Sequence, residues 1–218
     1  MASDAAQSDG LAAKRPSAPF RPIVAFDFDG TLTCRDSFLA FLAWRAGNAR
    51  HALGMARLAK AAIAYGVDHD RGRLKAAMVR EFLAGAPADA LARDAERFAA
   101  AQSRRLLRPD AVRCWKLWQE RAARLVIVTA SPEILIAPFA RGLGAERLIG
   151  TRLQLGPGGV VTGALDGPNC RGPEKVVRLR EAFGDEVHLE AAYGDSDGDI
   201  EMLALADEPG MNVFGERP

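Results

Sequence analysis

The stretch IVAFDFDGTLT, residues Ile23 to Thr33, decides the fold of this chain. Its apolar beginning lies between a proline and a glycine, and it predicts a buried strand over about residues 21–27. Asp27 and Asp29 lie two residues apart, so both side chains leave an extended backbone on the same side. Because an unpaired buried carboxylate is costly, the pair indicates a bound cation. Two hard oxygen ligands at the end of a core strand suit Mg²⁺.

Length and charge narrow the functional classes. The chain has 218 residues, enough for a core domain and an inserted module. Its 29 Lys and Arg against 28 Asp and Glu leave a net charge of +1, so we expect no nucleic-acid partner and no anionic-membrane partner. The three cysteines lack CxxC spacing and predict free thiols in a reducing compartment. Residues 1–20 lack an apolar segment, so we expect a disordered leader, no signal peptide and a cytoplasmic protein. The oligomeric state stays open.

Strand and helix patterns alternate in the second half of the chain. The run Leu125–Val128 is apolar throughout and predicts a parallel strand buried on both faces. Further strands are predicted at 147–150, 188–193 and 211–214, helices at 133–142, 175–183 and 200–206, and a β-hairpin at 151–165. This order predicts an α/β fold with a doubly wound parallel sheet, whose ligand site lies beyond the carboxyl ends of its strands.

The segment 36–107 is helical in character and lacks strand-like alternation. Breaks are expected at Gly47-Asn48, at 66–68 and at 85–87. We therefore expect a helical cap at 36–107, inserted into an α/β core made of 21–35 and 108–218, after a leader at 1–20.

Two further stretches carry polar groups that suit phosphate. Thr129-Ala130-Ser131 follows the second apolar strand, and a hydroxyl with free backbone N–H groups between a strand and a helix forms a phosphate cradle. Lys175 follows the hairpin, and a fixed ammonium can balance the charge of a phosphate and a carboxylate. Arg171 is a nearby competitor for that role.

The last motif is Tyr193-Gly194-Asp195-Ser196-Asp197-Gly198-Asp199. Its three carboxylates repel one another unless a cation is present. We assign Asp195 to direct metal binding, expect Asp199 to orient a metal-bound water or Lys175, and expect Asp197 to be solvated.

These four motifs resemble those of the haloacid dehalogenase (HAD) superfamily, over roughly residues 21–214. The resemblance is closest to subfamily IB, the phosphoserine-phosphatase-like branch, which carries a helical cap after the first motif. It implies a HAD-like Rossmannoid core and a Mg²⁺-dependent phosphatase that acts on a small phosphate ester. Asp29 favours a phosphatase over a carbon–halogen hydrolase, because the dehalogenases lack an acid at that place.

The resemblance also implies a role for each matching residue. Asp27 is the nucleophile that forms an aspartyl-phosphate, Asp29 is the general acid and base, and Lys175 balances the charge. Thr129 binds the phosphate through its hydroxyl, and Ala130 binds it through its amide. The implied metal ligands are Asp27, Asp29, Asp195 and Asp199.

The substrate is less defined than the reaction. Asp36 lies where phosphoserine phosphatases read the substrate ammonium, but it can equally be the N-cap of a helix. Gly198 departs from the Asn typical of those enzymes. Some relatives dephosphorylate phosphatidylglycerophosphate, and residues 53–65 could lie on a membrane, although packing within the cap is the favoured interpretation. A phospho-ligand binding module without catalysis is the alternative from another class. Lys75 and Arg80 on the cap could reach an anion of the substrate, but on a charged helix a solvated surface position is the favoured interpretation for both.

Overall fold

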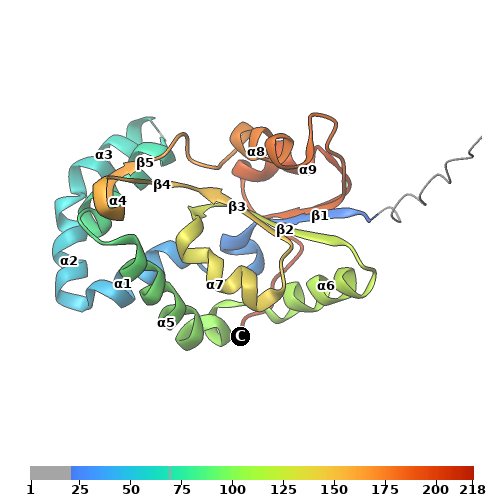
Figure 1. Cartoon of the computed structure of the whole chain (residues 1–218), viewed down its shortest axis with the longest axis horizontal. Coiled ribbons are helices and arrows are strands. Elements are labelled where there is room, and N and C mark those ends of the chain that lie inside the picture. The colour runs from blue at the N-terminus through green and yellow to red at the C-terminus, as the bar shows by residue number, and fades with distance from the viewer. Residues whose placement is uncertain (1–20, 69) are drawn as a thin grey trace, which may run out of the picture.

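The computed structural model describes residues 21–68 and 70–218, so the predicted leader and His69 lie outside the described residues. A five-stranded parallel sheet forms the centre of the core, in the order β3-β2-β1-β6-β7 (Figure 1). The strands are β1 (Ile23–Phe26), β2 (Arg124–Pro132), β3 (Arg147–Thr151), β6 (Leu189–Gly194) and β7 (Ala206–Met211). The predicted doubly wound parallel sheet is confirmed, and the strand of the first motif lies in its middle.

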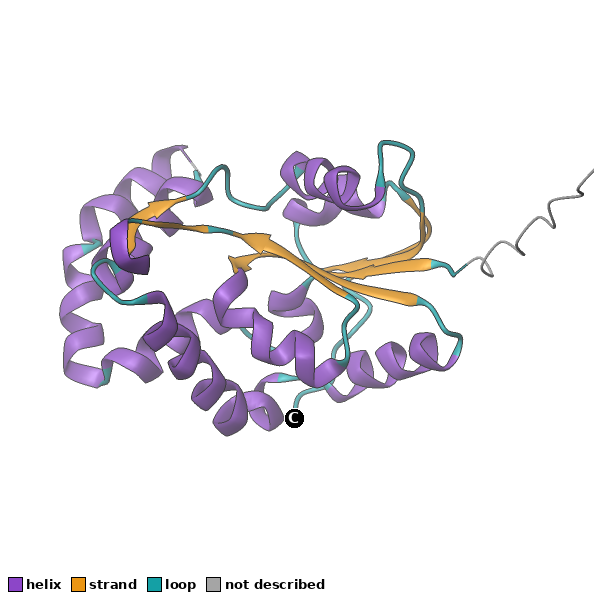
Figure 2. Cartoon of the chain, in the orientation of Figure 1, coloured by secondary structure: helices purple, strands orange, loops and turns teal. Residues whose placement is uncertain are grey.

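Helices cover both faces of this sheet (Figure 2). On one face lie α6 (Pro109–Glu120) and α7 (Glu133–Leu143), and on the other lie α8 (Pro173–Phe183) and α9 (Ile200–Leu203). Along β1, Val24 and Phe26 join the hydrophobic cluster on the α6 and α7 side, whereas Ala25 joins the one on the α8 and α9 side. Successive side chains of a strand point to opposite faces, so a continuous apolar run is needed to bury both faces.

A π-helical turn, Phe28–Leu32, follows β1. Among the described residues, five α-helices come next, and together they are called the cap: α1 (Ser37–Ala46), α2 (Asn48–Arg57), α3 (Ala59–Asp68), α4 (Arg71–Leu83) and α5 (Ala88–Leu106). The predicted breaks at Gly47 and at 85–87 are found. The break predicted at 66–68 was wrong, because α3 continues to Asp68 and α4 begins at Arg71. A further break at Leu58 separates α2 from α3 and lacks a glycine or proline signal in the sequence. Asp70 caps α4 by accepting a hydrogen bond from the backbone N–H of Arg73 at 2.9 Å.

The cap helices and the core share one hydrophobic cluster. Phe139 of α7 lies between Phe28 and Phe98, with ring centroids at 5.3 and 6.1 Å. The predicted hairpin is found as β4 (Leu153–Leu155) and β5 (Val161–Leu165). Its Val161 exchanges backbone hydrogen bonds of 2.9 Å with Gly85 and Ala86, so the hairpin extends from the core to the cap.

The last strand was predicted at 211–214, and this prediction was wrong. β7 begins at Ala206 and ends at Met211, which also shortens the helix predicted at 200–206 to Ile200–Leu203. The strand contains Asp-Glu-Pro-Gly, a pattern typical of a turn. It lies at the edge of the sheet, where a proline is tolerated because one side of the strand has no pairing neighbour. Phe214 instead packs against Tyr193, with ring centroids 5.3 Å apart.

Candidate active site

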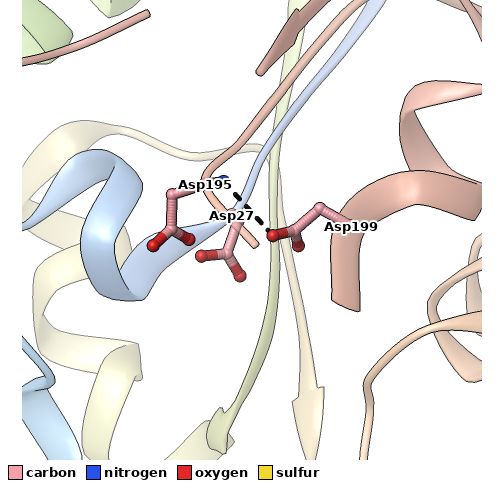
Figure 3. A group of neighbouring side chains, drawn as sticks. All are labelled: Asp27, Asp195 and Asp199. Atoms are coloured by element: carbon pink, nitrogen blue, oxygen red, sulfur yellow. Dashed lines mark hydrogen bonds between the residues drawn. The ribbon is translucent and has the colours of Figure 1, made fainter. Parts of the chain in front are cut away.

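The carboxyl ends of β1 and β6 bring the first and last motifs together. The backbone N–H of Asp27 donates to the carbonyl of Tyr193 at 2.8 Å and so continues the pairing of the two strands. Asp27, Asp195 and Asp199 each place one carboxylate oxygen within 4.8 Å of the others (Figure 3). The predicted meeting of these distant acidic residues is therefore found.

Lys175 is buried between two of these carboxylates, at 1% exposure. Its ammonium donates to Asp27 Oδ1 and Asp199 Oδ1, each at 2.6 Å, and to the carbonyl of Val128 at 2.7 Å. Burial alone would lower the pKa of Lys175, but the charges of Asp27 and Asp199 raise it above its ordinary value. The competitor Arg171 also lines the cavity described below, but it pairs with Asp197.

Asp199 already has donors on both carboxylate oxygens. Lys175 donates to Oδ1, and Oδ2 accepts the backbone N–H groups of Asp195 at 3.2 Å and Ser196 at 3.0 Å, together with the Ser196 hydroxyl at 3.0 Å. Asp199 therefore contacts Lys175, one of the two groups that it was predicted to orient, and its role toward a metal-bound water stays a prediction. Ser196 and Asp199 together form a capping box at the turn that follows β6.

The remaining carboxylate oxygens are suited to a divalent cation. Among residues 21–68 and 70–218, Asp27 Oδ2 receives no hydrogen bond, and Asp195 receives one long contact of 3.5 Å from the Thr31 hydroxyl. Burial raises the pKa of Asp27 to about 7 against the opposing effect of Lys175, and burial together with Asp199 raises the pKa of Asp195. A cation between Asp27 and Asp195 would relieve both costs, so these residues fit Mg²⁺.

Asp29 lies beside this cluster, and its carboxylate is not among the three oxygens that converge. One oxygen accepts the backbone N–H of Ser37 at 2.7 Å, and the other accepts the Ser131 hydroxyl at 2.5 Å. Its carboxylate therefore faces the start of α1 and the end of β2. Its assignment as a metal ligand stays a prediction, and Ser131, to which we had assigned no role, is its partner from the second motif.

Thr129 and Ala130 lie at the end of β2, and both line the cavity described below. The Thr129 hydroxyl accepts the backbone N–H of Ser131 at 3.0 Å, which orients it within the turn. The Ala130 carbonyl accepts the Thr151 hydroxyl at 2.7 Å and the Lys75 ammonium at 2.5 Å. Contacts from the hairpin region and from the cap therefore hold the second motif in place.

A cavity of about 410 Å³ lies between the ends of the strands and the helices α1 to α4. Its core side carries Asp27, Asp29, Lys175 and Asp199. Its cap side carries Leu39, Met55, Leu58, Ala62, Tyr65, Arg71, Leu74, Lys75 and Met78. The cavity therefore joins a charged end, where the first and last motifs meet, to a cap end that is largely apolar.

The surface interpretation of Lys75 was wrong, whereas that of Arg80 is confirmed by its exposure. Lys75 is half-buried, and burial lowers its pKa against the opposing effects of Asp29 and Asp36. A signal for its position was present in the sequence. Arg71, Leu74, Lys75 and Met78 follow the spacing i, i+3, i+4, i+7, which places them on one face of a helix.

Asp36 is the N-cap of α1, so the first of its two predicted roles, helix capping, is confirmed. Its predicted role in reading a substrate stays a prediction. Its side chain accepts the backbone N–H of Leu39 at 2.8 Å. It also lines the cavity, where burial and then the charge of Asp29 raise its pKa. Capping a helix and lining a ligand cavity are compatible for one carboxylate, because only one of its oxygens is used by the cap.

Gly198 leaves room for Arg171. A Cβ at position 198 would lie 2.6 Å from Arg171 Cγ, so a larger residue there would displace this arginine from the cavity lining.

Replacing Gly30 with Ala is expected to displace Asp195. Gly30 has a φ of +86°, and an added Cβ would overlap the Asp195 carboxylate. Gly47 is a matched control, because its φ of +73° is similar but nothing lies within 4 Å of an added Cβ. Backbone strain should cost each variant about 1 kcal/mol in the free energy of unfolding. Only Gly30→Ala should also lose Mg²⁺ binding in calorimetry, and equal Mg²⁺ affinities in the two variants would contradict this expectation.

Comparisons with known proteins agree with this geometry. A sequence model of the haloacid dehalogenase-like hydrolases matches residues 24–204. The chain is 55% identical over 222 residues to Protein CicA of Caulobacter vibrioides, with 100% of both chains covered.

Solved structures share this fold over most of the chain. A Bordetella pertussis Tohama I protein of unknown function is 25% identical with a TM-score of 0.71, over 87% of this chain and 88% of that one. A phosphoserine phosphatase with an analogue of its phospho-aspartyl intermediate is 20% identical with a TM-score of 0.60, over 87% of this chain and 85% of that one, so the two share a fold. With its family motifs matched over 24–204, this chain belongs to the haloacid dehalogenase-like hydrolases.

Proposed function

We propose that this protein is a Mg²⁺-dependent phosphomonoesterase that acts through an aspartyl-phosphate on Asp27. The observation that carries this proposal is the contact between Asp27 and the buried Lys175, beside the oxygens of Asp195 and Asp199, at the charged end of a cavity. Phosphoryl transfer requires mainly positioning and neutralisation of charge, and these groups are suited to both.

The first step needs a carboxylate aimed at phosphorus. Lys175 holds the Asp27 carboxylate at the charged end of the cavity, where it can attack a phosphate. The Thr129 hydroxyl and the Ala130 amide are suited to hold the phosphate oxygens. When bound between Asp27 and Asp195, Mg²⁺ would neutralise negative charge on the phosphate and the nucleophile. Attack by Asp27 forms its bond to phosphorus as the bond to the substrate alcohol breaks.

Both steps need a group that moves protons, and Asp29 fits this role. Hydrogen bonds from Ser37 and Ser131 hold its carboxylate, which also lines the cavity. In the proposed reaction, Asp29 gives a proton to the leaving alcohol oxygen. It then takes one from a water that attacks phosphorus and releases Asp27.

We propose a small phosphorylated metabolite as the substrate, and a cytoplasmic location for the protein. The family resemblance suggests a phosphoserine-like compound within that class, whereas the apolar residues on the cap side of the cavity favour a less polar alcohol. A lipid phosphatase of the phosphatidylglycerophosphate type and a binding module without catalysis are the alternatives. Within the described ranges, the helices are too short or too polar to cross a bilayer.

The proposed function is tested by the release of phosphate from p-nitrophenyl phosphate and from a panel of phosphate esters. Release should require Mg²⁺ and stop when a chelator removes it. A protein that binds Mg²⁺ and inorganic phosphate but hydrolyses no ester in the panel would instead be a binding module. Sedimentation with anionic vesicles at low salt tests the lipid alternative, which predicts binding.

Mg²⁺ affinity is expected to depend on pH. The pKa of Asp27 is about 7 without a metal, so Asp27 carries a proton over a growing fraction of molecules as the pH falls below 7. Mg²⁺ must displace that proton, so its apparent affinity should fall by up to about tenfold per pH unit below 7 and level off above it. Calorimetric titration at pH 6, 7 and 8 measures this slope. Asp27→Asn should remove the slope, and an unchanged slope in this variant would assign the proton to another group.

A further inference from the structure

The cap end of the cavity combines seven largely apolar side chains with three charged residues, Asp36, Arg71 and Lys75. The apolar set comes from α1 to α4 and from the break between α2 and α3, and it consists of Leu39, Met55, Leu58, Ala62, Tyr65, Leu74 and Met78. The phosphate-binding groups lie at the opposite, charged end. A ligand whose phosphate lies at Asp27 therefore directs its alcohol toward this wall. An apolar wall gains free energy by covering an apolar group and gains little from a polar one.

The carboxylates nearest the cap already have hydrogen-bond donors. Both oxygens of Asp29 accept hydrogen bonds, from Ser37 and from Ser131, and Asp36 accepts the backbone N–H of Leu39. Lys75 adds an ammonium to the same region, with its Nζ 5.6 Å from the centroid of the Phe38 ring at the start of α1. Within the described part of the chain, Asp36 keeps one oxygen without a hydrogen bond, but the positive charge of Lys75 would repel an ammonium on the substrate, so the cavity is better suited to an alcohol without one.

Resting on the phosphatase function above, we propose that the natural substrate is a phosphomonoester whose alcohol carries an apolar chain or ring. Its phosphate lies against Asp27 and Lys175, and its apolar part covers the cap wall of α1 to α4. The cap residues Leu39 and Met55 line this wall and remain partly exposed, at 38% and 41%, so their side chains are available to such a group.

Chain length in a series of alkyl phosphates tests this substrate class. The value of kcat/KM should rise about two- to fourfold for each methylene that the wall covers, which makes octyl phosphate at least about 50-fold better than ethyl phosphate. Phosphoserine should be poorer than butyl phosphate. A flat series, or a preference for phosphoserine, would overturn the proposed substrate class.

The same apolar group could belong to a soluble metabolite or to a lipid in a membrane. Octyl phosphate below its micelle concentration represents the first source, and hexadecyl phosphate in phosphatidylcholine vesicles represents the second. If either octyl phosphate or hexadecyl phosphate is hydrolysed faster than ethyl phosphate, the apolar site is supported, and the preferred probe identifies the source of the substrate. If neither is hydrolysed faster, the proposed apolar site is wrong.

Variants of the cap residues test whether the cap wall causes the preference for long alkyl phosphates. The double variant Leu39→Gln/Met55→Gln changes two partly exposed side chains, so we expect it to fold. Its ratio of kcat/KM between octyl and ethyl phosphate should fall at least about tenfold. Ile63→Gln is the matched control, because Ile63 lies on α3 at 71% exposure and outside the cavity lining, and its ratio should not change. An unchanged ratio in the double variant would show that the wall does not select the substrate.

Failure of the substrate class and failure of the phosphatase function give different results. If no ester in the series releases phosphate with Mg²⁺ present, the phosphatase function itself is wrong. If short polar esters are hydrolysed at least as well as octyl phosphate, the phosphatase function holds and the apolar substrate class alone is wrong.

Discussion

Asp27→Asn is expected to lower kcat for phosphate-ester hydrolysis at least about 10⁴-fold, because it removes the nucleophile itself. The amide oxygen of Asn can still accept the hydrogen bond from Lys175, which the Asp27 carboxylate accepts at 2.6 Å. The fold should therefore survive, and circular dichroism checks that it does. Asp185→Asn is the matched control, since Asp185 is exposed, and it should retain full activity.

Trapping the intermediate separates a nucleophile from a residue that only holds the metal. Acid quenching during turnover, followed by mass spectrometry, should find one phosphoryl group on the peptide that contains Asp27. Asp29→Asn should slow release of this group more than its formation when the leaving group needs no proton, as with p-nitrophenyl phosphate. A quenched enzyme without a phosphoryl group on Asp27, under conditions where Asp29→Asn turns over slowly, would argue against covalent catalysis.

Sequence reasoning succeeded where a local pattern and a chemical requirement agree. The strand before Asp27 is apolar on both faces, and its end carries two carboxylates, so both its burial and its place beside a site could be predicted. The same reasoning placed Lys175 and Asp195 by their order among the motifs. These predictions depend on parallel strands ending at one edge of a sheet, which is a property of the whole fold class.

The remaining features depend on tertiary contacts that no local pattern specifies. Pro209 reads as a turn, yet it lies in an edge strand because its neighbours in the sheet are set by the whole chain order. Lys75 and Ser131 acquire their partners, Ala130 and Asp29, from segments distant in sequence. The direction in which each cap residue points, and with it the apolar character of the cavity, also required coordinates.

Lys175→Met is expected to lower the free energy of unfolding of the metal-free protein by about 3–5 kcal/mol, because it leaves two buried carboxylates without their cation. Lys116→Met, an exposed control on α6, should stay within about 0.5 kcal/mol of the parent. The loss should also depend on pH. Burial raises the pKa of Asp27 to about 7 even beside Lys175, and without this lysine the pKa rises further.

When the pKa of a carboxyl group is raised in the folded state, the protein loses stability as the pH rises toward and through that pKa, because the folded state must then accommodate an unfavourable charge. Chemical denaturation should therefore find a larger loss for Lys175→Met at pH 8 than at pH 6. Mg²⁺ should recover part of it at pH 8, since a cation again meets Asp27. A loss that is the same at both pH values would mean that the variant disturbs packing and leaves the charges of the site unaffected.

A double-mutant cycle with Asp199→Asn isolates the charge term. In Asp199→Asn alone, the amide oxygen of the new side chain can keep the hydrogen bonds from Asp195 and Ser196, but its NH₂ group then faces the Lys175 ammonium. In the double variant, the same NH₂ group faces a methionine side chain. The double variant should thus be more stable than the sum of the single losses predicts, by more than about 1 kcal/mol. Additive losses would mean that Lys175 does not act on Asp199 as a paired charge. In that case, only a bound metal ion would balance the negative charges of the first and last motifs.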